Sequence, residues 1–431
     1  MRILEVIHGY PPRYNAGSEI YTQTISRALS QLGHEVAVFT REEDPYRPDF
    51  NITVETDILN PSIRVYLANH ARSRDRYRHN GMDEAFRGVL NIFQPDILHI
   101  NHLNHLSTGI IDVASDEGLP IVYTLHDYWL ACPRGQFLQM ALGDEKVYPE
   151  CPSQENERCA FHCMSRMWGG VNLEEDKAYW TRWVELRMKD VRGICDKISL
   201  FISPSLYLKK RITEELVLPE DRIVHEPYGF DHSRLKGRNR VRENEFVFGY
   251  IGRIVPAKGV DLLIKAFGAT HGKARLRIWG RPTQQDSPAL KRIIEDLPND
   301  RLKLIEWLPE YQNEDIVKAV FNRTDAIVVP SIWDENSPLV IQEALQAKVP
   351  VITSDKGGMA ELIKDGINGW NFHHRSVDDL AKRLQNAIDM PELLDRLSRR
   401  GYLLSENGEV HSIEKHAIRL ETIFKSLVEA H

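Results

Sequence analysis

The stretch from Pro330 to Gly369 constrains the fold and function of this chain most strongly. It follows an apolar segment, passes through a polar loop and continues into an expected helix, Leu339–Ala347. Pro338 fits the first turn of that helix, because proline lacks an N–H that would have no partner there. The backbone N–H groups of Leu339 and Val340 would then form an anion site at a helix N-terminus, suited to a pyrophosphate.

Two carboxylates bracket this expected anion site. Glu335 lies in the polar loop, followed by Asn336 and Ser337, and Glu343 lies eight positions further on, in the expected helix. A carboxylate can accept two hydroxyl hydrogen bonds, which is what a vicinal diol presents. We therefore expect one glutamate to hold a sugar and the other a ribose. The alternative is an ordinary strand–loop–helix with two solvated glutamates.

The residues around these glutamates resemble the signature of retaining GT-B glycosyltransferases of family 4. The Glu-x7-Glu motif of that family matches Glu335 and Glu343 in spacing. Neighbouring pairs that also match are Pro330-Ser331, Glu343-Ala344, Pro350-Val351 and Gly357-Gly358. The resemblance implies a GT-B fold, in which two Rossmann-like, doubly wound α/β domains face each other across a cleft that holds the active site. The C-terminal domain would bind the nucleotide sugar and the N-terminal domain the acceptor.

The length of the chain, 431 residues, also predicts two domains. Strands alternate with helices in both halves, which favours two parallel sheets. We expect residues 1–232 to form the N-terminal domain, with a cysteine-containing insertion at about 132–170, and residues 233–405 to form the C-terminal domain. The charged segment 233–245 is expected to be the linker. By resemblance, residues 406–431 would carry a helix that packs back on the N-terminal domain.

Two basic residues follow the first expected strand of the second half. Gly252-Arg253 and Lys258-Gly259 match the Gly-Arg and Lys-Gly pairs of the family. A guanidinium and an ammonium group would stabilise the charge that grows on a nucleoside diphosphate leaving group. Gly280-Arg281, at the end of a later strand, is expected to form a wall of the nucleotide pocket.

The N-terminal half contributes two further candidates. The loop after its first expected strand contains Ala16-Gly17-Ser18-Glu19, which resembles a Gly-Gly-x-Glu element facing donor phosphate and acceptor, with alanine in place of one glycine. Gly17 alone would allow the close backbone approach, and a plain βα turn with Ser18 as helix N-cap is the alternative. His126 follows another strand. The resemblance implies that it contacts the donor sugar, although a lone histidine is more often structural.

The resemblance implies transfer with retention at the anomeric carbon and without a divalent metal, the departing phosphate helping to deprotonate the acceptor hydroxyl. Arg253 and Lys258 would neutralise the diphosphate, Glu335 would position the donor sugar, and Glu343 would hold the ribose. The frequency of donors in the family favours a UDP-hexose. Analogy with the family implies a glycan or lipid-linked acceptor and a role in envelope or exported polysaccharide synthesis.

Two other functions remain open. A nucleotide-sugar epimerase could be built on the same double-Rossmann plan. A two-lobed solute-binding protein without catalysis is a second alternative, but such proteins are usually exported, and the N-terminus MRILEVIHGYPP predicts a first strand and not a signal peptide. No G-x-G-x-x-G follows the first strand of either half, which disfavours a dinucleotide dehydrogenase.

Four of the five cysteines, Cys132, Cys151, Cys159 and Cys163, fall within 32 residues of one another, in a segment predicted to be irregular. Four thiolates could bind a structural zinc ion or an iron–sulfur cluster. Their spacing, C-x18-C-x7-C-x3-C, is not a standard zinc-ribbon pattern. Two disulfides or four free thiols are therefore also open, and a cytosolic location would disfavour disulfides.

The charge of the chain excludes some partners and leaves one basic segment to explain. A net charge of −7 and a pI of about 6.2 give no bulk attraction to nucleic acid. No run approaches the ~18 apolar residues of a membrane span, so a cytoplasmic protein is expected. Contact with the inner face of a membrane stays open. Arginines at 72, 74, 76, 78 and 87 form either a solvated loop or an acceptor-side basic patch.

Overall fold

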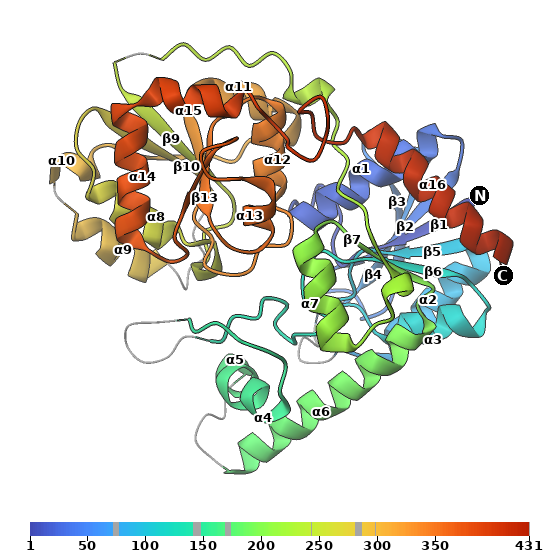
Figure 1. Cartoon of the computed structure of the whole chain (residues 1–431). Coiled ribbons are helices and arrows are strands. Elements are labelled where there is room, and N and C mark those ends of the chain that lie inside the picture. The colour runs from blue at the N-terminus through green and yellow to red at the C-terminus, as the bar shows by residue number, and fades with distance from the viewer. Residues whose placement is uncertain are drawn as a thin grey trace. The chain divides into compact units, whose positions relative to one another are not determined.

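The computed structural model describes residues 1–71, 77–140, 148–168, 174–242, 244–280, 287–297 and 299–430. The chain divides into two compact units (Figure 1). Unit 1 comprises Met1–Gly229 together with Ile413–His431, and unit 2 comprises Phe230–Ser412. Residues 230–232 and 406–412, which were expected outside the C-terminal domain, thus belong to unit 2.

In the described part of unit 1, a sheet of eight strands has the order β3-β4-β2-β1-β5-β6-β7-β8. All neighbouring strands are parallel except β3 and β4, which form an antiparallel pair at one edge. The strands are β1 (Arg2–Val6), β2 (Glu35–Glu42), β3 (Ile52–Thr56), β4 (Arg64–Asn69), β5 (Ile97–Ile100), β6 (Ile121–Thr124), β7 (Leu200–Ser203) and β8 (Ile223–His225).

The helices of unit 1 connect these strands. They are α1 (Gly17–Gln31), α2 (Asn80–Phe93), α3 (Gly109–Asp116), α4 (Asn156–Cys159), α5 (Ser165–Trp168), α6 (Glu174–Lys197), α7 (Leu206–Leu216) and α16 (Ile413–Ala430). A π-helical turn, η1 (Ala160–Met164), joins α4 to α5. The insertion at about 132–170 is therefore partly helical and not irregular as expected.

Unit 2 contains, among its described residues, a sheet of six parallel strands in the order β11-β10-β9-β12-β13-β14. They are β9 (Phe246–Ile251), β10 (Ala274–Trp279), β11 (Ile305–Leu308), β12 (Ala326–Val329), β13 (Val351–Ser354) and β14 (Trp370–Phe372). Counted along unit 2, this is the strand order 3-2-1-4-5-6 of the Rossmann fold. The expectation of two doubly wound α/β domains is confirmed.

The helices of unit 2 follow its strands. They are α8 (Val260–Gly268), α9 (Ser287–Glu295), α10 (Asn299–Leu302), α11 (Ile316–Ala319), α12 (Leu339–Gln346), α13 (Gly357–Leu362), α14 (Val377–Asp389) and α15 (Pro391–Ser398). Pro391 begins α15 just after α14 ends, as expected for a residue that cannot continue a helix but fits a first turn.

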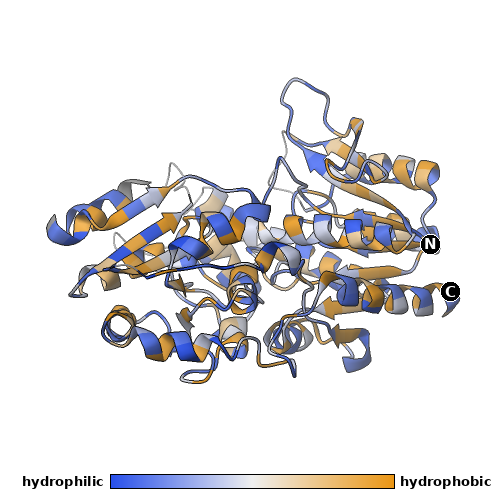
Figure 2. Cartoon of the chain, turned by 90° about the horizontal axis from the view of Figure 1, so that it is seen from above, coloured by the Kyte–Doolittle hydropathy of each residue, from blue (hydrophilic) through white to orange (hydrophobic). Residues whose placement is uncertain are grey.

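Hydrophobic residues run along the strands of both sheets (Figure 2). Ile3 and Leu4 of β1, on opposite faces of the strand, are both fully buried, and so are Ile97 and Leu98 of β5. Near-continuous apolar strands of this kind are typical of parallel sheets covered by helices on both faces. This pattern agrees with the expectation of parallel sheets in both halves of the chain.

The C-terminal helix α16 packs against α1 in unit 1. The Tyr21 hydroxyl lies 2.8 Å from Nε2 of His416, and Nε2 of His34 lies 3.1 Å from Oε1 of Glu421. Phe424 is fully buried. The last helix therefore completes the unit with which the chain began.

Two expected helix starts differ from the structure. Helix α1 begins at Gly17 with Ala16 as its N-cap, whereas Ser18 donates its hydroxyl to Glu19, 2.8 Å away, instead of capping the helix. Helix α12 begins at Leu339, and Pro338 is its N-cap instead of a residue of the first turn. The ψ angle of Pro338, 118°, is extended, so the chain turns into the helix one residue later than expected.

The segment expected to be a linker, 233–245, is attached to unit 2 through its arginines. Arg240 donates from Nε and Nη2 to the two oxygens of Asp325, at 3.0 and 2.9 Å, and Arg242 donates to the same carboxylate. Asp325 is 1% exposed and also accepts a hydrogen bond from the backbone N–H of Val247. This buried carboxylate therefore binds the segment that precedes β9.

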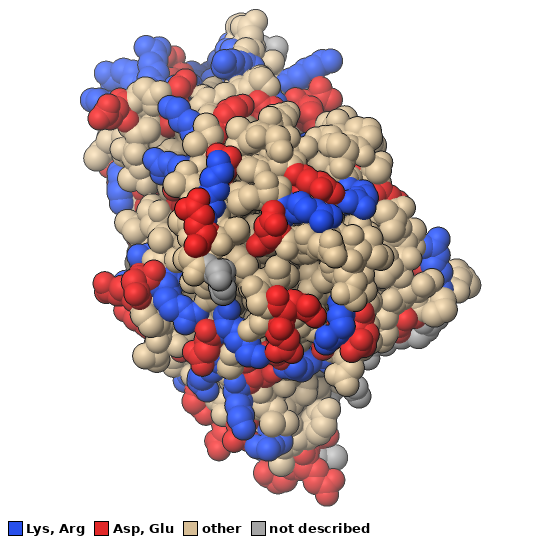
Figure 3. Space-filling view, turned by 90° about the vertical axis from the view of Figure 1, so that its right-hand side faces the viewer, with Lys and Arg blue, Asp and Glu red and all other residues tan. Residues whose placement is uncertain are grey.

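No helix in the described ranges has both the length and the apolar character needed to cross a membrane. On the face drawn in Figure 3, basic and acidic residues are interspersed. Three members of the basic segment, at positions 72, 74 and 76, lie outside the described residues. Arg78 forms ion pairs with Asp112 and Asp190 in unit 1, so its charge is already compensated.

We expect Asp325→Ala to destabilise unit 2 by about 3 kcal/mol, because it removes the buried carboxylate that pairs with Arg240, whereas Arg242 keeps its pair with Asp395. Urea unfolding followed by circular dichroism measures the change. Asp296→Ala is the control, because Asp296 is exposed, and it should change the free energy of unfolding by less than about 0.5 kcal/mol. Equal midpoints for the two variants would contradict the role assigned to Asp325.

Candidate functional site

The centre of the unit 2 sheet is the point where the strand order reverses. Strands β9 and β12 are neighbours, but the chain continues from β9 to β10 on one side and from β12 to β13 on the other. In open α/β sheets, ligands bind outside the carboxyl ends of the strands at such a switch point. The loops that leave this point contain Gly252–Lys258 and Pro330–Ser337, which hold most of the residues expected to bind the donor.

An ion pair joins these two loops. Nζ of Lys258 lies 2.6 Å from Oε1 of Glu335, and the hydroxyl of Ser331 donates to the same oxygen at 2.6 Å. Glu335 is buried, whereas about a third of the Lys258 side chain is exposed. Gly259 has a φ of +66°, and a Cβ there would lie 2.0 Å from the carbonyl oxygen of Pro330. Glycine at this position therefore permits the approach of the two loops.

The Gly357-Gly358 pair supports the loop that carries Glu335. The backbone N–H of Gly358 donates to the carbonyl oxygen of Glu335 at 2.7 Å. A Cβ on Gly358 would lie 1.4 Å from the carbonyl oxygen of Asn336, a distance that no side chain could occupy. The start of α13 therefore packs directly against the loop after β12, and the two glycines determine where Glu335 and Asn336 lie.

Glu343 is paired with an arginine that was not predicted as a site residue. Nη2 of Arg234 donates to Oε1 of Glu343, and Arg234 also lies 3.4 Å from the carbonyl oxygen of Asn313. Both side chains are largely buried. The Oε2 atom of Glu343 accepts no hydrogen bond from the described residues, so it remains able to accept one from a ligand. Burial and the charge of Glu343 raise the pKa of the nearby Tyr311.

The remaining donor-side candidates lie around this pair of loops. The backbone N–H groups of Leu339 and Val340 are the first of α12, and Pro338 offers them no side-chain cap. Arg253 is exposed, and its backbone carbonyl accepts a hydrogen bond from the Tyr250 hydroxyl at 2.8 Å. Gly252 precedes it with a φ of +146°. Asn336 and Ser337 are buried in the loop after β12, and Arg281 lies outside the described residues.

His126 follows β6 in unit 1 and has hydrogen-bond partners on both ring nitrogens. Nδ1 lies 2.7 Å from the hydroxyl of Tyr228, and Nε2 lies 3.3 Å from Oδ1 of Asn101. Asn101 uses its amide nitrogen to donate to Oε2 of Glu5, so the atom that faces His126 is Oδ1, which can only accept a hydrogen bond. The imidazole therefore carries its proton on Nε2 and accepts from Tyr228 at Nδ1.

The charge state of His126 follows from its surroundings. Burial lowers its pKa well below the usual 6.5, and the neighbouring His102 and His99 lower it further. His126 is thus a neutral imidazole at pH 7, which can donate or accept a hydrogen bond but cannot supply a positive charge.

The loop after β1 lies beside a second group of polar side chains at the same edge of the unit 1 sheet. Gly17 is exposed at the start of α1, and Glu19 approaches His8, with 3.3 Å between Oε1 and Nε2. The ring of His8 lies 4.6 Å from that of His102, which in turn approaches Asp127 at 3.2 Å. Ligands of the unit 1 sheet would meet these side chains.

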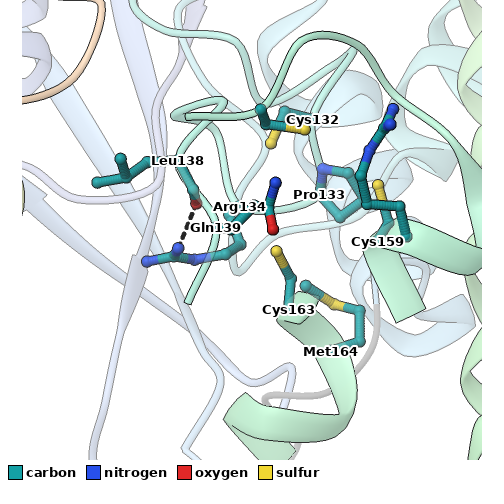
Figure 4. Close-up of a pocket in the computed structure, with 10 residues that line it drawn as sticks. Cys132, Pro133, Arg134, Leu138, Gln139, Cys159, Cys163 and Met164 are labelled. Atoms are coloured by element: carbon teal, nitrogen blue, oxygen red, sulfur yellow. Dashed lines mark hydrogen bonds between the residues drawn. The ribbon is translucent and has the colours of Figure 1, made fainter. Parts of the chain in front are cut away.

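The structure brings the four clustered cysteines to one small cavity of about 10 Å³ (Figure 4). Its walls include Cys132, Cys151, Cys159 and Cys163. All four are free thiols, and Cys195 lies apart on α6. As the side chains stand, no three of the His, Cys, Asp or Glu residues within the described ranges are arranged to hold one metal ion.

Comparison with known families and proteins identifies relatives along almost the whole chain. Residues 231–404 match the family model described as glycosyl transferases group 1, and residues 16–234 match that of glycosyltransferase family 4. A glycogen synthase of Mycobacterium tuberculosis is 25% identical, over 93% of this chain and 89% of its own. A D-inositol 3-phosphate glycosyltransferase of a Mycobacterium species is 29% identical, over 86% of this chain and 77% of its own.

A solved structure of the same fold is that of Anabaena HepE in complex with UDP and glucose. It superposes with a TM-score of 0.69 at 15% sequence identity and covers 99% of this chain and all of its own. This likeness confirms the expected fold, GT-B.

We expect the imidazole of His126 to remain neutral from pH 6 to 8, because burial lowers its pKa. Asn101→Asp would place a carboxylate beside Nε2 and should raise that pKa, since a nearby negative charge favours the imidazolium. NMR titration of labelled histidines measures both values, with His126→Gln to assign the signal. Asn239→Asp, at an exposed position of unit 2, should leave it unchanged. A titration near 6.5 in the unmodified protein would contradict the expectation.

Proposed function

Because the chain belongs to glycosyltransferase family 4, we propose that it moves a hexose from a UDP-sugar to a hydroxyl of a glycan or lipid-linked acceptor, with retention at the anomeric carbon. Unit 2 binds the donor and unit 1 binds the acceptor. The reaction serves the synthesis of an envelope or exported polysaccharide. The relatives named above, a glycogen synthase and an inositol phosphate glycosyltransferase, support sugar transfer as the reaction class.

The observation that carries the proposal is the arrangement at the switch point of the unit 2 sheet. There, the Lys258–Glu335 pair and the N-terminus of α12 come from loops that start on neighbouring strands. A nucleoside diphosphate sugar needs cations and N–H groups for its phosphates and carboxylates for its hydroxyls. This edge of the sheet offers both kinds of group. That HepE was solved with UDP is consistent with a UDP donor.

Each group then has a specific role in donor binding. Lys258, Arg253 and the N–H groups that begin α12 neutralise the diphosphate. Glu343 accepts the ribose diol with its unoccupied oxygen, Oε2, while Arg234 holds Oε1 and so fixes the direction of the carboxylate. Glu335 accepts hydroxyl groups of the transferred sugar. Because Lys258 contacts Glu335, the carboxylate proposed to bind the sugar would lie next to the cation proposed to bind the phosphates.

The chemistry is a substitution at the anomeric carbon. The bond between this carbon and the β-phosphate oxygen breaks, and a bond to the acceptor oxygen forms on the same face. The acceptor proton passes to the departing phosphate oxygen, and UDP leaves with the bonding electron pair. Arg253 and Lys258 stabilise the negative charge that grows on the phosphate. His126, a neutral donor through Nε2–H, would exchange its bond to Asn101 for one to a sugar hydroxyl.

A nucleotide-sugar epimerase of the same fold is the competing function. It would change the sugar of the donor without an acceptor and without net release of UDP. UDP release that depends on an added glycan or lipid-linked acceptor therefore separates the two reactions.

We expect UDP, and not GDP or ADP, to stabilise the protein in a thermal-shift panel. A ligand at 100 times its dissociation constant adds roughly 2.7 kcal/mol to the free energy of unfolding. Glu343→Gln should abolish the UDP-dependent shift, because the neutral amide accepts a diol more weakly and no longer pairs with Arg234.

The control for this variant is Glu314→Gln, at an exposed position in unit 2, which should keep the full shift. Each shift is taken relative to the same variant without nucleotide, so that a general loss of stability does not count. An unchanged UDP shift in Glu343→Gln would refute the ribose assignment, and a shift with GDP or ADP alone would refute the donor.

We expect Lys258→Met and Glu335→Gln to differ in which step they affect. Lys258→Met should weaken UDP binding, whereas Glu335→Gln should slow transfer by about 10–100-fold, the worth of hydrogen bonds to a charged group, with UDP affinity almost unchanged. Calorimetry with UDP and acceptor-dependent UDP release measure the two effects. Because the side chains are in contact, the double variant should not be additive. Equal effects of both changes on UDP affinity would contradict the separate roles.

A further inference from the structure

We propose that Cys132, Cys151, Cys159 and Cys163 together bind one zinc ion. The ion would tie the part of the insertion that contains Cys151, Cys159 and Cys163 to the turn at Cys132, which follows β6. The site would be structural and separate from the groups assigned to sugar transfer. The four thiols come from three parts of the insertion, yet all line the cavity drawn in Figure 4. Convergence of this kind is not required by packing alone, since apolar side chains would fill the space more simply.

Local backbone structure positions each cysteine. Cys132 lies in a tight turn, where its N–H donates to the carbonyl oxygen of Tyr128 at 2.7 Å. Cys151 ends the second arm of a short antiparallel pairing and donates its N–H to Phe137 at 2.8 Å. Cys159 and Cys163 lie four residues apart across the π-helical turn, so they share one face of the helical segment. π-helical turns occur frequently at functional sites.

The size of the cavity favours a single ion. Its volume, about 10 Å³, is close to the minimum that holds one water molecule, roughly 10–15 Å³. A cluster of several irons and sulfides would need more room. Four thiolates around one tetrahedral ion are typical of structural zinc sites.

A second, independent observation is a buried positive charge without a negative partner. Arg187 of α6 is 1% exposed, and its hydrogen bonds go to the carbonyl oxygen of Trp129 and to Sδ of Met188. Within the described ranges no carboxylate forms an ion pair with it. A buried charge is costly unless a charge of opposite sign compensates it. Burial lowers the pKa of Arg187 to about 10, which reflects the cost of this buried charge.

Two more arginines surround the same cysteines. Arg134 and Arg158 both line the cavity. Arg134 donates to the backbone carbonyl of Leu138, and Arg158 donates to the backbone carbonyl and the hydroxyl of Ser153. Neither has a carboxylate partner in the part of the chain that the structure describes. Neutral thiols would leave this positive charge uncompensated. One zinc ion with four thiolates carries a net charge of −2, which would compensate it.

Binding requires the sulfur atoms to turn toward the centre of the cavity, because they are not arranged as a ligand set as they stand. The position of each Sγ depends on one side-chain torsion, χ1, which has three staggered minima. A change of rotamer therefore moves the sulfur while the backbone turns stay in place. Gln139, whose amide donates to the carbonyl of Glu150 at 3.2 Å, also lines the cavity and would have to leave room for the ion.

The consequence for the rest of unit 1 follows from the turn that contains Cys132. Tyr128 donates its N–H to the carbonyl oxygen of Gly135 at 3.1 Å, and a Cβ on Gly135 would lie 2.8 Å from Oδ2 of Asp127. The turn thus packs against the residue that follows His126. A zinc ion on Cys132 would tie the insertion to this edge of the sheet.

The test measures the metal content of the full-length chain, purified without metal-affinity chromatography or chelators. Elemental analysis by mass spectrometry should find about one zinc per chain. A separate assay should find no acid-labile sulfide. Cys159→Ala and Cys163→Ala should each lose most of the zinc. Cys195→Ala should retain it, because Cys195 is equally buried but lies outside the cavity. Absence of zinc, zinc that persists in the two variants, or iron with labile sulfide would overturn the proposal.

A measurement on the unmodified protein guards against variants that fail to fold. The protein is unfolded in denaturant with a chelator, refolded with Co²⁺, and studied by absorption spectroscopy. Sulfur-to-cobalt charge transfer together with intense d–d bands would report tetrahedral thiolate ligation. A spectrum without these bands would overturn the proposal. UDP binding is followed in the same samples and should not depend on the metal, so the donor proposal can fail or succeed separately.

The buried arginine gives a last discriminating variant. Arg187→Met keeps the bulk of the side chain but removes its charge. The zinc affinity, measured against a competing chelator, should then fall by about 10–100-fold, which is typical when a residue that supports metal ligands without binding the metal is changed. Arg192→Met, at an exposed position of the same helix, should leave the affinity unchanged. Equal zinc affinity in both variants would refute the role of Arg187 as counter-charge.

Discussion

The ion pair between Lys258 and Glu335 joins the two loops that leave the centre of the unit 2 sheet in opposite directions. The rest of the candidate donor site depends on this contact, because it determines how close the loops after β9 and β12 approach. The contact in turn requires Gly259 and Gly358, at which any Cβ would collide with backbone oxygens. A single interaction between side chains thus depends on two positions at which only glycine fits.

The parts of the fold that could be predicted from sequence are those with local causes. Buried parallel strands are continuous apolar runs, and residues at their carboxyl ends share one edge of the sheet. The positions of Glu335, in the loop after β12, and of Glu343, in α12, could therefore be predicted from the order of strands and loops, whereas their roles were inferred from the family resemblance. The edge strands β3 and β14 are not evident from the sequence: β3 is partly exposed and β14 has only three residues, so neither gives a long apolar run.

The partners of the candidate residues could not be predicted, because they are remote in sequence. Arg234 and Glu343 are 109 positions apart, and Tyr228 lies 102 positions from His126. No pattern within a window of the sequence relates such residues. The predicted start of α12 was wrong for a different reason. The extended ψ of Pro338 follows from the shape of the preceding loop, which packs on α13.

The chain leaves unit 1 at Gly229 and returns to it at Ile413, so that unit 2 is inserted within unit 1. The two ends of unit 2 are adjacent, since Phe230 donates its N–H to the carbonyl oxygen of His411 at 2.9 Å. During synthesis, unit 2 is therefore complete before unit 1 has received α16. Unit 1 therefore begins to emerge from the ribosome before unit 2 and is finished after it. Until then, the surface of α1 that receives α16 must stay uncovered without associating with other chains.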